Sequence, residues 1–318
     1  MNKINVNDYL SKEEIQQLLK KSDWKAAWAF LHTWLWIAFA FAIAGLWPNP
    51  FTIIIAMFII GGKQLACAIL MHDCAHRSMF NSKDAHKFFG NWLAGYHILH
   101  DVERYRPYHI EHHVKTGTDD DPDLSLTKGY PTTVISFTRK VIRDLIGASG
   151  IKGHVAVLVM HFGYLKYELG GRIIKIKQKN FFTALKIFCK NMAGPIAANL
   201  IVFGILWLCG KPWLYLLWIG SLLTTYNFSL RIRSIAEHSA VPDRLNDFQN
   251  TRTTYSNFFE KILFAPHHVN YHSEHHLLMT VPSYNFPEMH RLIKERGFYR
   301  KGLLKNNYIE IFKLAIKK

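Results

Sequence analysis

The 318-residue chain is poor in cysteine and in charged residues, and these shortages exclude several classes of protein. It has four cysteines and no C-x-x-C pair, so neither a disulfide-rich scaffold nor a cysteine zinc site is expected. Charged residues make up 19% of the chain, against a usual fraction of about 25%, and hydrophobic residues make up 49%. Intrinsic disorder is excluded as well, because so much apolar surface is available for burial.

Acidic residues are also scarce, since 23 aspartates and glutamates oppose 39 lysines and arginines, for a formal net charge of +16. Such a balance is typical of proteins that bind nucleic acid or an anionic membrane surface. The distribution of the charges favours the membrane, because residues 26–62 contain no charged side chain. Prolines at positions 48 and 50 divide this run into two segments, since proline does not continue a helix.

Four apolar segments have about the length that a helix needs to cross a bilayer core, which is about 20 residues. The first two are joined by the turn at 47–50, and the last two by Lys211 and Pro212. A pair of buried hairpins in a large soluble protein is the alternative, but these runs exceed what a soluble core requires. The sequence predicts an all-α integral membrane protein with four transmembrane helices in two hairpins, at residues 27–47, 51–71, 193–210 and 213–230. Tryptophans expected at the membrane interfaces are Trp24, Trp28, Trp47, Trp207, Trp213 and Trp218.

Lysine and arginine predict the orientation, because they are enriched in cytoplasmic loops. The turn at 47–50 has neither residue and the turn at 211–212 has one, whereas residues 73–191 contain 18. Both turns are therefore expected on the translocated side, and both termini in the cytoplasm. Residues 1–26, 72–192 and 231–318 would form the cytoplasmic helical part of one domain that comprises residues 1–318. This bias explains much of the net charge, so no nucleic-acid partner is expected.

Local patterns indicate a helix near each end of the chain. Ser11 and Glu14 fit a capping box, which predicts a helix over residues 12–21, and residues 1–25 lack the features of a secretory signal. Residues 308–316 place Tyr308 and Ile311 on one helical face, which would serve either a docked tail or a peripheral membrane contact.

Histidine is abundant, with 18 copies, and half of them follow a pattern. Two lie four residues apart at the cytoplasmic end of the second span, and H-x-x-H-H occurs twice, at 109–113 and 272–276. Residues at i, i+3 and i+4 share one face of a helix, so each pattern can point its imidazoles at one place. With one more histidine just after the fourth span, nine imidazoles would meet beneath the bilayer: His72, His76, His109, His112, His113, His238, His272, His275 and His276.

This repeated spacing predicts a metal site, although a single histidine of this kind is ordinarily structural. Neutral imidazole is the commonest metal ligand. Nine ligands are too many for one ion and fit two ions with four or five each, since a tetrahedral zinc takes about four. Imidazole suits iron, copper, nickel or zinc, so the ligand type alone leaves the metal open. A ferritin-like di-iron site is not indicated, because the chain contains no E-x-x-H motif.

Three segments resemble the histidine boxes of the membrane-bound fatty acid desaturase family. They are HDCAH at 72–76, RPYHIEHH at 106–113 and NYHSEHH at 270–276. His238 matches the additional ligand of that family, and the resemblance extends over about residues 31–291. Residues 72–81 and 105–126 look most like bacterial members, including the group associated with rhizobitoxine biosynthesis.

The resemblance implies two iron ions (Fe2+/Fe3+) held by the nine histidines, with O2 as co-substrate and a fatty acyl chain as substrate. Loss of hydrogen from two neighbouring carbons would leave a double bond, and the acyl chain would enter along an apolar tunnel among the spans. Two electrons would come from a separate ferredoxin- or cytochrome-type donor, because no H-P-G-G haem motif is present. The implied location is the bacterial inner membrane, with the active site facing the cytoplasm. The division of the ligands between the two irons stays open.

Other functions remain open beside this one. The same ligands would serve a hydroxylase, a ketolase or a decarboxylating alkene-forming enzyme, and the rhizobitoxine group suggests an amino-acid-like or other non-lipid substrate. A non-enzymatic metal-binding membrane protein, such as a transporter, would need polar residues at mid-membrane. The predicted spans offer little for this, since Lys63 and His32 are their only charged or histidine residues.

Some neighbours of the nine histidines are candidates to support them. Pro266 can open a helix that carries His268 onto the ligand face, as a tenth ligand or, preferably, as a hydrogen-bond partner of one. Asp73 and Glu237 each adjoin a proposed ligand, and metal-bound histidines usually donate their other N–H to a carboxylate or carbonyl. For Glu237, a salt bridge to Arg231 or Arg233 is an equal alternative.

Other polar residues near the boxes have less specific expectations. Asn270 and Asn227 are candidates to hold an iron-bound water, a role that the resemblance implies for some members. The acidic turn at 119–123 lacks the pattern of a calcium loop and is expected to be solvated, with a carboxylate partner for a ligand as the alternative. Glu111 and Glu274 should point away from the metals. The other histidines, His100 among them, are expected to be structural.

Overall fold

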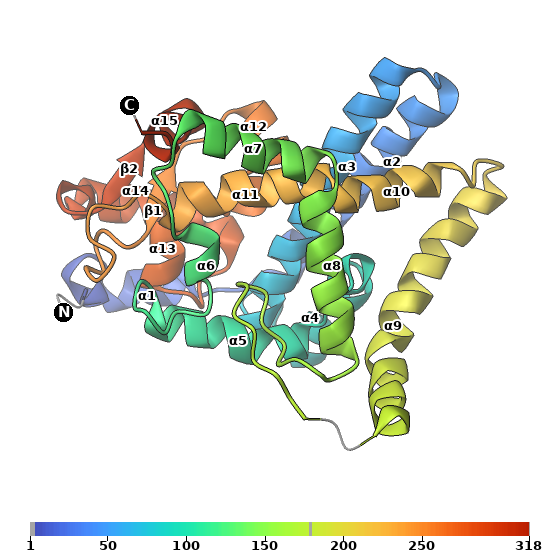
Figure 1. Cartoon of the computed structure of the whole chain (residues 1–318). Helices are drawn as coiled ribbons and strands as arrows, with labels where there is room; N and C mark the ends of the chain where they lie inside the picture. Colours follow the sequence, from blue (N-terminus) through green and yellow to red (C-terminus); the bar gives the residue numbers. More distant parts are fainter. Residues whose placement is uncertain (1–3, 178–179, 318) are drawn as a thin grey trace.

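Three long apolar helices form the frame of the molecule (Figure 1). The computed structural model describes residues 4–177 and 180–317. The helices α2 (Asp23–Leu46), α3 (Pro50–Ala75) and α9 (Phe181–Leu208) have 24, 26 and 28 residues and are long and apolar enough to cross a membrane. At about 1.5 Å per residue, each exceeds the bilayer core of about 30 Å. α2 and α3 pack as the predicted hairpin.

The segment predicted as the fourth span, residues 213–230, is not one helix. It is divided into α10 (Leu214–Leu223) and α11 (Thr225–His238), because Thr224 between them has φ −117° and ψ −87°. The side-chain amide of Asn227 donates to the carbonyl of Leu222 across this break, at 2.9 Å, and so satisfies a carbonyl at the end of α10. The two helices run nearly end to end in Figure 1. The prediction of one continuous span here is wrong, and among the described residues three helices meet the length and composition of a span.

Two adjacent glycines bring α11 and α12 (Phe258–Leu263) against the middle of α3. A Cβ atom at Gly61 would lie 2.6 Å from the backbone nitrogen of Tyr226, and one at Gly62 would lie 2.4 Å from the carbonyl oxygen of Ile262. Any larger residue at either position would push these elements apart. The close approach therefore fixes where α11 starts, and with it the place of His238 at its end.

Shorter elements surround the ends of the long helices (Figure 1). The remaining α-helices are α1 (Lys12–Leu18), α4 (Lys83–Trp92), α5 (Val102–Lys115), α6 (Leu124–Thr127), α7 (Val134–Leu145), α8 (Ala148–His161), α13 (His272–Leu277), α14 (Phe286–Glu295) and α15 (Tyr308–Ala315). Single 3-10 turns lie at Val6–Asp8, Gly95–Ile98, Pro266–His268, Ser283–Asn285 and Phe298–Arg300. Two short strands, β1 (Arg252–Thr254) and β2 (Leu303–Lys305), pair in parallel.

Both helices predicted near the chain ends are present. The backbone N–H of Glu14 donates to the hydroxyl of Ser11, and the N–H of Ser11 donates to the Glu14 carboxylate, which confirms the capping box of α1. At the other end, Tyr308 and Ile311 of α15 are buried against residues of α11 such as Ile232. The C-terminal helix is therefore a docked tail.

The largest apolar cluster lies where α2, α3 and α10 meet. Trp218 of α10 is fully buried there, and its ring stacks on that of Trp34 with 6.1 Å between centroids. The prediction that Trp218 lies at a membrane interface is therefore wrong. The tryptophans with mostly exposed side chains, as an interface position requires, are Trp24, Trp28, Trp47 and Trp207.

Candidate metal centre

The nine predicted histidines come from four helices whose ends meet. The last turn of α3 and its C-cap carry two of them, and α5 carries three on one side. α11 ends at His238, and α13 begins at His272 and carries the other two. The helical spacing of each pattern turns its imidazoles toward the same place, as expected.

Five of the imidazoles form one cluster. The candidate ligand atoms of its members all lie within 4.8 Å of one another. These five rings come from α3, α5 and α13, so three separate parts of the chain contribute. We call this group the five-histidine cluster: His72, His76, His109, His113 and His275.

The other four imidazoles lie beside the first group. His112, His238 and His276 bring their nitrogens within 4.8 Å of one another, and Nε2 of His272 lies 2.7 Å from Nε2 of His238. We call these residues the four-histidine cluster. The rings of His113 and His276 stack at 4.3 Å, so the two clusters are direct neighbours.

Both clusters contain buried nitrogens with no partner. Nε2 of His72, both ring nitrogens of His76 and Nε2 of His276 are buried and have no hydrogen-bond partner among the described residues. Nε2 of His275 instead faces Nε2 of His113 at 2.9 Å. Buried polar atoms are normally satisfied, so converging nitrogens of this kind fit a metal ion in each cluster.

Protein groups hold the opposite nitrogen of several of these rings. Nδ1 of His112 lies 2.8 Å from Oδ1 of Asp121, and Nδ1 of His238 lies 3.0 Å from the backbone oxygen of Asn250. Both partners are acceptors, so the proton of each neutral ring must be on Nδ1. The lone pair is then on Nε2, the atom available to a metal.

The acidic turn is only partly the solvated loop expected from the sequence, since Asp119 and Asp120 are exposed but Asp121 is not. Asp121 is buried and accepts the backbone N–H groups of Gly117 and Asp123 in addition to the His112 ring. Burial alone would raise the pKa of Asp121, but the hydrogen bonds from His112 and the two backbone groups hold it below its ordinary value. Asp121 therefore has the position of the alternative prediction, a carboxylate beside the candidate ligand His112.

The two carboxylates predicted beside the ligands also face them. Oδ1 of Asp73 lies 2.8 Å from Nδ1 of His72. Glu237 takes the salt-bridge alternative, since its Oε1 accepts from Nε of Arg233 at 2.6 Å. Nδ1 of His272 lies 3.5 Å from the same oxygen and has no hydrogen-bond partner among the described residues. Burial raises the pKa of Glu237 to about 7, although the Arg233 guanidinium opposes this shift.

Burial favours the neutral form of seven of these histidines. It lowers the pKa of His76 and of His238 to about 3, and nearby cations and imidazoles add to the effect. A metal ligand must be free of the competing proton, so this state at pH 7 suits ligation. Burial is also the main cause that holds the pKa well below its ordinary value in five further rings. These are His109, His113, His272, His275 and His276.

His268 does not occupy the position expected for it. Pro266 opens a single 3-10 turn, and His267 and His268 have left-handed backbone angles, with φ 51° and 62°. No helix therefore joins His268 to His272, so the two do not share a face. His268 instead lines a separate cavity beside α2 and α3.

The two predicted asparagines have backbone partners. Nδ2 of Asn270 donates to the carbonyl oxygen of Thr254 at 2.9 Å, while its Oδ1 is buried with no partner among the described residues. Asn227 is engaged at the break between α10 and α11. Its amide nitrogen therefore serves the fold.

Other residues near the boxes match their expectations. Nδ1 of His100 lies 2.9 Å from the hydroxyl of Tyr167, and His100 belongs to neither cluster. Glu111 pairs with Arg172 at the edge of the site. The buried carboxylate of Glu274 binds Thr253, at 2.6 Å, rather than a cluster histidine.

Arg252 supports the site and was not anticipated. Its guanidinium is buried and donates to four carbonyl oxygens at the end of α11, at 3.0 to 3.4 Å. A helix end leaves such carbonyls without partners, so Arg252 replaces the missing donors and fixes the turn that follows His238. No sequence motif signals this role, because the acceptors are backbone atoms of Ile235, Ala236, Ser239 and Ala240.

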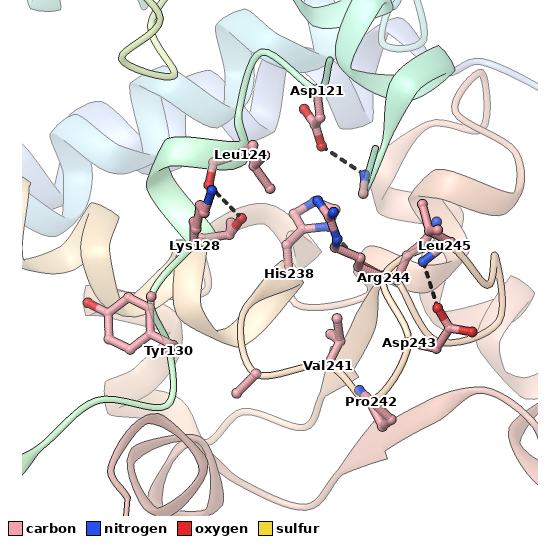
Figure 2. A pocket seen from close by; sticks show the side chains of 15 residues that line it. Asp121, Leu124, Lys128, Tyr130, His238, Val241, Pro242, Asp243, Arg244 and Leu245 are labelled. Atoms are coloured by element: carbon pink, nitrogen blue, oxygen red, sulfur yellow. Dashed lines mark hydrogen bonds between the residues drawn. The ribbon is translucent and has the colours of Figure 1, made fainter. Parts of the chain in front are cut away.

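A cavity of about 600 Å³ adjoins the four-histidine cluster (Figure 2). Figure 2 shows His238 in its middle, with Asp121 above and Lys128 and Arg244 on opposite sides. The cavity is only partly enclosed, so a route from the surface leads to the edge of the candidate metal centre.

Comparison with known proteins identifies the family. A model described as fatty acid desaturase matches residues 44–306, a range that includes all nine histidines. The chain belongs to the fatty acid desaturase family. The resemblance drawn from the three histidine boxes is thus confirmed, and family membership indicates an oxidoreductase with a membrane context.

Several desaturases are similar to this chain. The sn-1 oleoyl-lipid 12-desaturase of Picosynechococcus sp. is 24% identical over 250 residues, which cover 75% of this chain and 68% of that protein. The enzyme of the same name from Synechocystis sp. is 25% identical over 268 residues, or 81% and 73% of the two chains. Dihydrorhizobitoxine desaturase of Bradyrhizobium elkanii is 24% identical over 243 residues, which cover 72% of this chain and 64% of that protein.

Proposed function

We propose that this protein is an O2-dependent membrane desaturase that uses two iron ions to introduce a double bond into a fatty acyl chain. The observation that carries the proposal is the convergence of nine imidazoles into two adjacent clusters. The names of two similar proteins, both sn-1 oleoyl-lipid 12-desaturases, support the substrate class.

Each cluster would hold one iron. Bound iron would supply the activation of O2 and the removal of hydrogen from an unactivated carbon. All-nitrogen neutral ligands suit this chemistry, because they leave the charge on the metal high. Asp73 and Asp121 would orient the rings of His72 and His112 and keep their Nε2 lone pairs directed at the metals.

The long helix α3 would connect the membrane to the site. It is apolar over most of its length and carries His72 in its last turn. An acyl chain that enters among the spans would therefore reach the clusters at the cytoplasmic end of α3. In this proposal the N-terminus, residues 72–192 and the C-terminus face the cytoplasm across a bacterial inner membrane, and α10 with the start of α11 takes the place of the fourth span.

A separate protein would supply the electrons. The formal net charge of +16 favours an acidic partner such as a ferredoxin, and the partly open cavity beside His238 gives such a partner access to the edge of the site. A cytochrome-type donor is the alternative, as expected from the sequence.

A non-lipid substrate is the second candidate. Dihydrorhizobitoxine desaturase, whose name specifies a different substrate class, is as similar to this chain as the lipid enzymes are. The same two clusters would serve both reactions, so only product analysis separates them.

The test is a lipid and metabolite profile of cells that express the wild type, His112→Ala or His154→Gln. His112 belongs to the four-histidine cluster, whereas His154 lies on α8 with Nδ1 near the carbonyl of Gly150. New unsaturated acyl chains with the wild type and His154→Gln, but not with His112→Ala, are expected. Unchanged acyl chains in all three strains would contradict the assignment to a lipid, and hydroxylated chains would contradict desaturation.

A further inference from the structure

A second cavity, of about 350 Å³, is lined by none of the nine histidines and lies beside the membrane helices. Its wall is formed by the start of α2, the middle of α3, the end of α12 and the turn after it. Its lining contains three lysines and three histidines, and no aspartate or glutamate among the described residues. These basic residues are Lys25, Lys63, Lys261, His32, His267 and His268.

Lys63 is the unusual member of this group. It lies in the middle of apolar α3, its side chain is 3% exposed, and it has no ion pair or hydrogen bond among the described residues. Among the described residues, Nζ of Lys63 makes a cation–π contact with the ring of Trp36, whose centroid is 5.5 Å away. An ammonium group buried in this way is costly unless an anion pairs with it. Since no described carboxylate lines the cavity, an anion from outside the chain is the partner that would pair with it.

Other side chains on the cavity wall also suit a polar ligand. His267 and His268 both adopt left-handed backbone angles, which are rare for residues with a side chain and are strained. This conformation brings both imidazoles to the wall. Nζ of Lys25 lies 5.4 Å from the centroid of the Tyr284 ring at the edge of the cavity.

The surroundings indicate an amphiphile rather than a soluble ion. Trp24 and Trp28 line the same cavity and are 74% and 50% exposed, as expected for tryptophans at the level of lipid headgroups. The neighbouring faces of α2 and α3 are apolar and long enough to contact acyl chains.

We propose that this cavity binds the anionic headgroup of a lipid, with a phosphate or carboxylate oxygen paired to Lys63. Lys25 and Lys261 would complete the charge balance at the rim, and the imidazoles would hydrogen-bond the remaining oxygens. The site is separate from the candidate metal centre, and its occupation does not depend on turnover.

The test is a thermal unfolding series on the full chain, loaded with iron and kept in a neutral detergent. The probes are phosphatidylglycerol, oleate, phosphatidylcholine and inorganic phosphate. Phosphatidylglycerol or oleate should raise the Tm of the wild type in a saturable way, because a ligand of the folded state stabilises it. Phosphatidylcholine, which has no net charge, and inorganic phosphate, which has no acyl chain, should leave the Tm unchanged.

Two lysine variants locate the effect. Lys63→Met should raise the half-saturating concentration of the anionic lipid about tenfold or more, which corresponds to the loss of one strong contact. Lys190→Met removes an exposed cation from another membrane helix, α9, and should leave the half-saturating lipid concentration unchanged. Without lipid, Lys63→Met should unfold at or above the wild-type temperature, because it removes an unpaired buried charge.

Three results would overturn the proposal. An equal rise in Tm with phosphatidylcholine would show that the headgroup charge is not needed. An equal rise with inorganic phosphate would show that the acyl chain is not needed. An unchanged lipid response in Lys63→Met would show that the lipid does not bind at Lys63. If Lys63→Met does not fold, Lys261→Gln on the exposed rim must weaken the response, and a response equal to that of the wild type would again contradict the proposal.

Discussion

At the scale of single residues, the site depends on the nitrogen of each imidazole that faces away from its cluster. The sequence shows the histidines themselves, because H-x-x-H-H and H-x-x-x-H are visible patterns. It does not show what fixes them. Asn250 contributes only a backbone oxygen to His238, and Asp121 stands in a run of acidic residues that looks like a solvated turn. The tertiary structure brings such partners to the imidazoles, so the spacing of residues in the sequence does not reveal them.

Asp121→Asn tests the support of His112. The variant keeps an acceptor oxygen but loses the charge that stabilises the Nδ1–H tautomer of His112. We expect the affinity for iron to fall about 10- to 100-fold, as is typical when such an outer partner is changed. Chelator competition on the purified protein measures this loss. Asp120→Asn, at an exposed neighbour, is the control and should bind iron like the wild type.

His86 should make stability depend on pH. Its Nε2 accepts the backbone N–H of Phe80 at 2.9 Å, and its Nδ1 lies 2.8 Å from the carbonyl oxygen of Ser82. Burial lowers the pKa of His86 from 6.5 to about 4. The neutral ring is therefore favoured in the folded state, and its contribution is complete above pH 6.5 and lost as the pH falls toward 4.

The measurement is the Tm of the wild type and of His86→Gln across this pH range. The wild type should lose more stability than the variant between pH 6.5 and 4, since glutamine has no proton to gain there. Parallel curves would show that His86 does not titrate as described.

At the scale of elements, the sequence predicts helices well where their cause is local. Long apolar runs and a proline turn indicate the α2–α3 hairpin to within a few residues. The break at Thr224 instead adjoins a close tertiary contact, since a Cβ atom at Gly150 of α8 would lie 2.1 Å from the carbonyl oxygen of Leu223. α9 also begins earlier than its apolar run, at Phe181, because a helix can continue through polar residues.

Two glycine substitutions test the packing of these elements. Gly62→Ala places a Cβ atom 2.4 Å from the carbonyl oxygen of Ile262 and should destabilise the protein by about 1–3 kcal/mol. In α9, Gly204→Ala meets nothing within 4 Å and should be neutral or stabilise by up to about 1 kcal/mol, because alanine favours a helix. Chemical unfolding in detergent measures both. Equal effects of the two substitutions would contradict the close approach of α12 to α3.

At the scale of the whole molecule, the charge distribution predicts one orientation in the membrane. The basic residues at 73–191 and the two clusters belong to the same predicted side of the membrane. Exposed Cys209, at the end of α9, belongs to the opposite side. A membrane-impermeant maleimide should therefore label Cys209 in cells whose outer envelope has been removed. With Cys189→Ser and Cys209→Ser as background, it should label Asp120→Cys only after the membrane is opened. The reverse pattern would invert the proposed topology.

The central claim is that nine histidines hold two iron ions. The most direct test is the iron and zinc content of the purified full chain after anaerobic loading with Fe(II). About two irons per chain are predicted for the wild type, since nine ligands divide into sets of about four and five. Asp120→Asn should match this value and His112→Ala should fall below it. About one iron, no iron after loading, or zinc that Fe(II) does not replace would contradict the account.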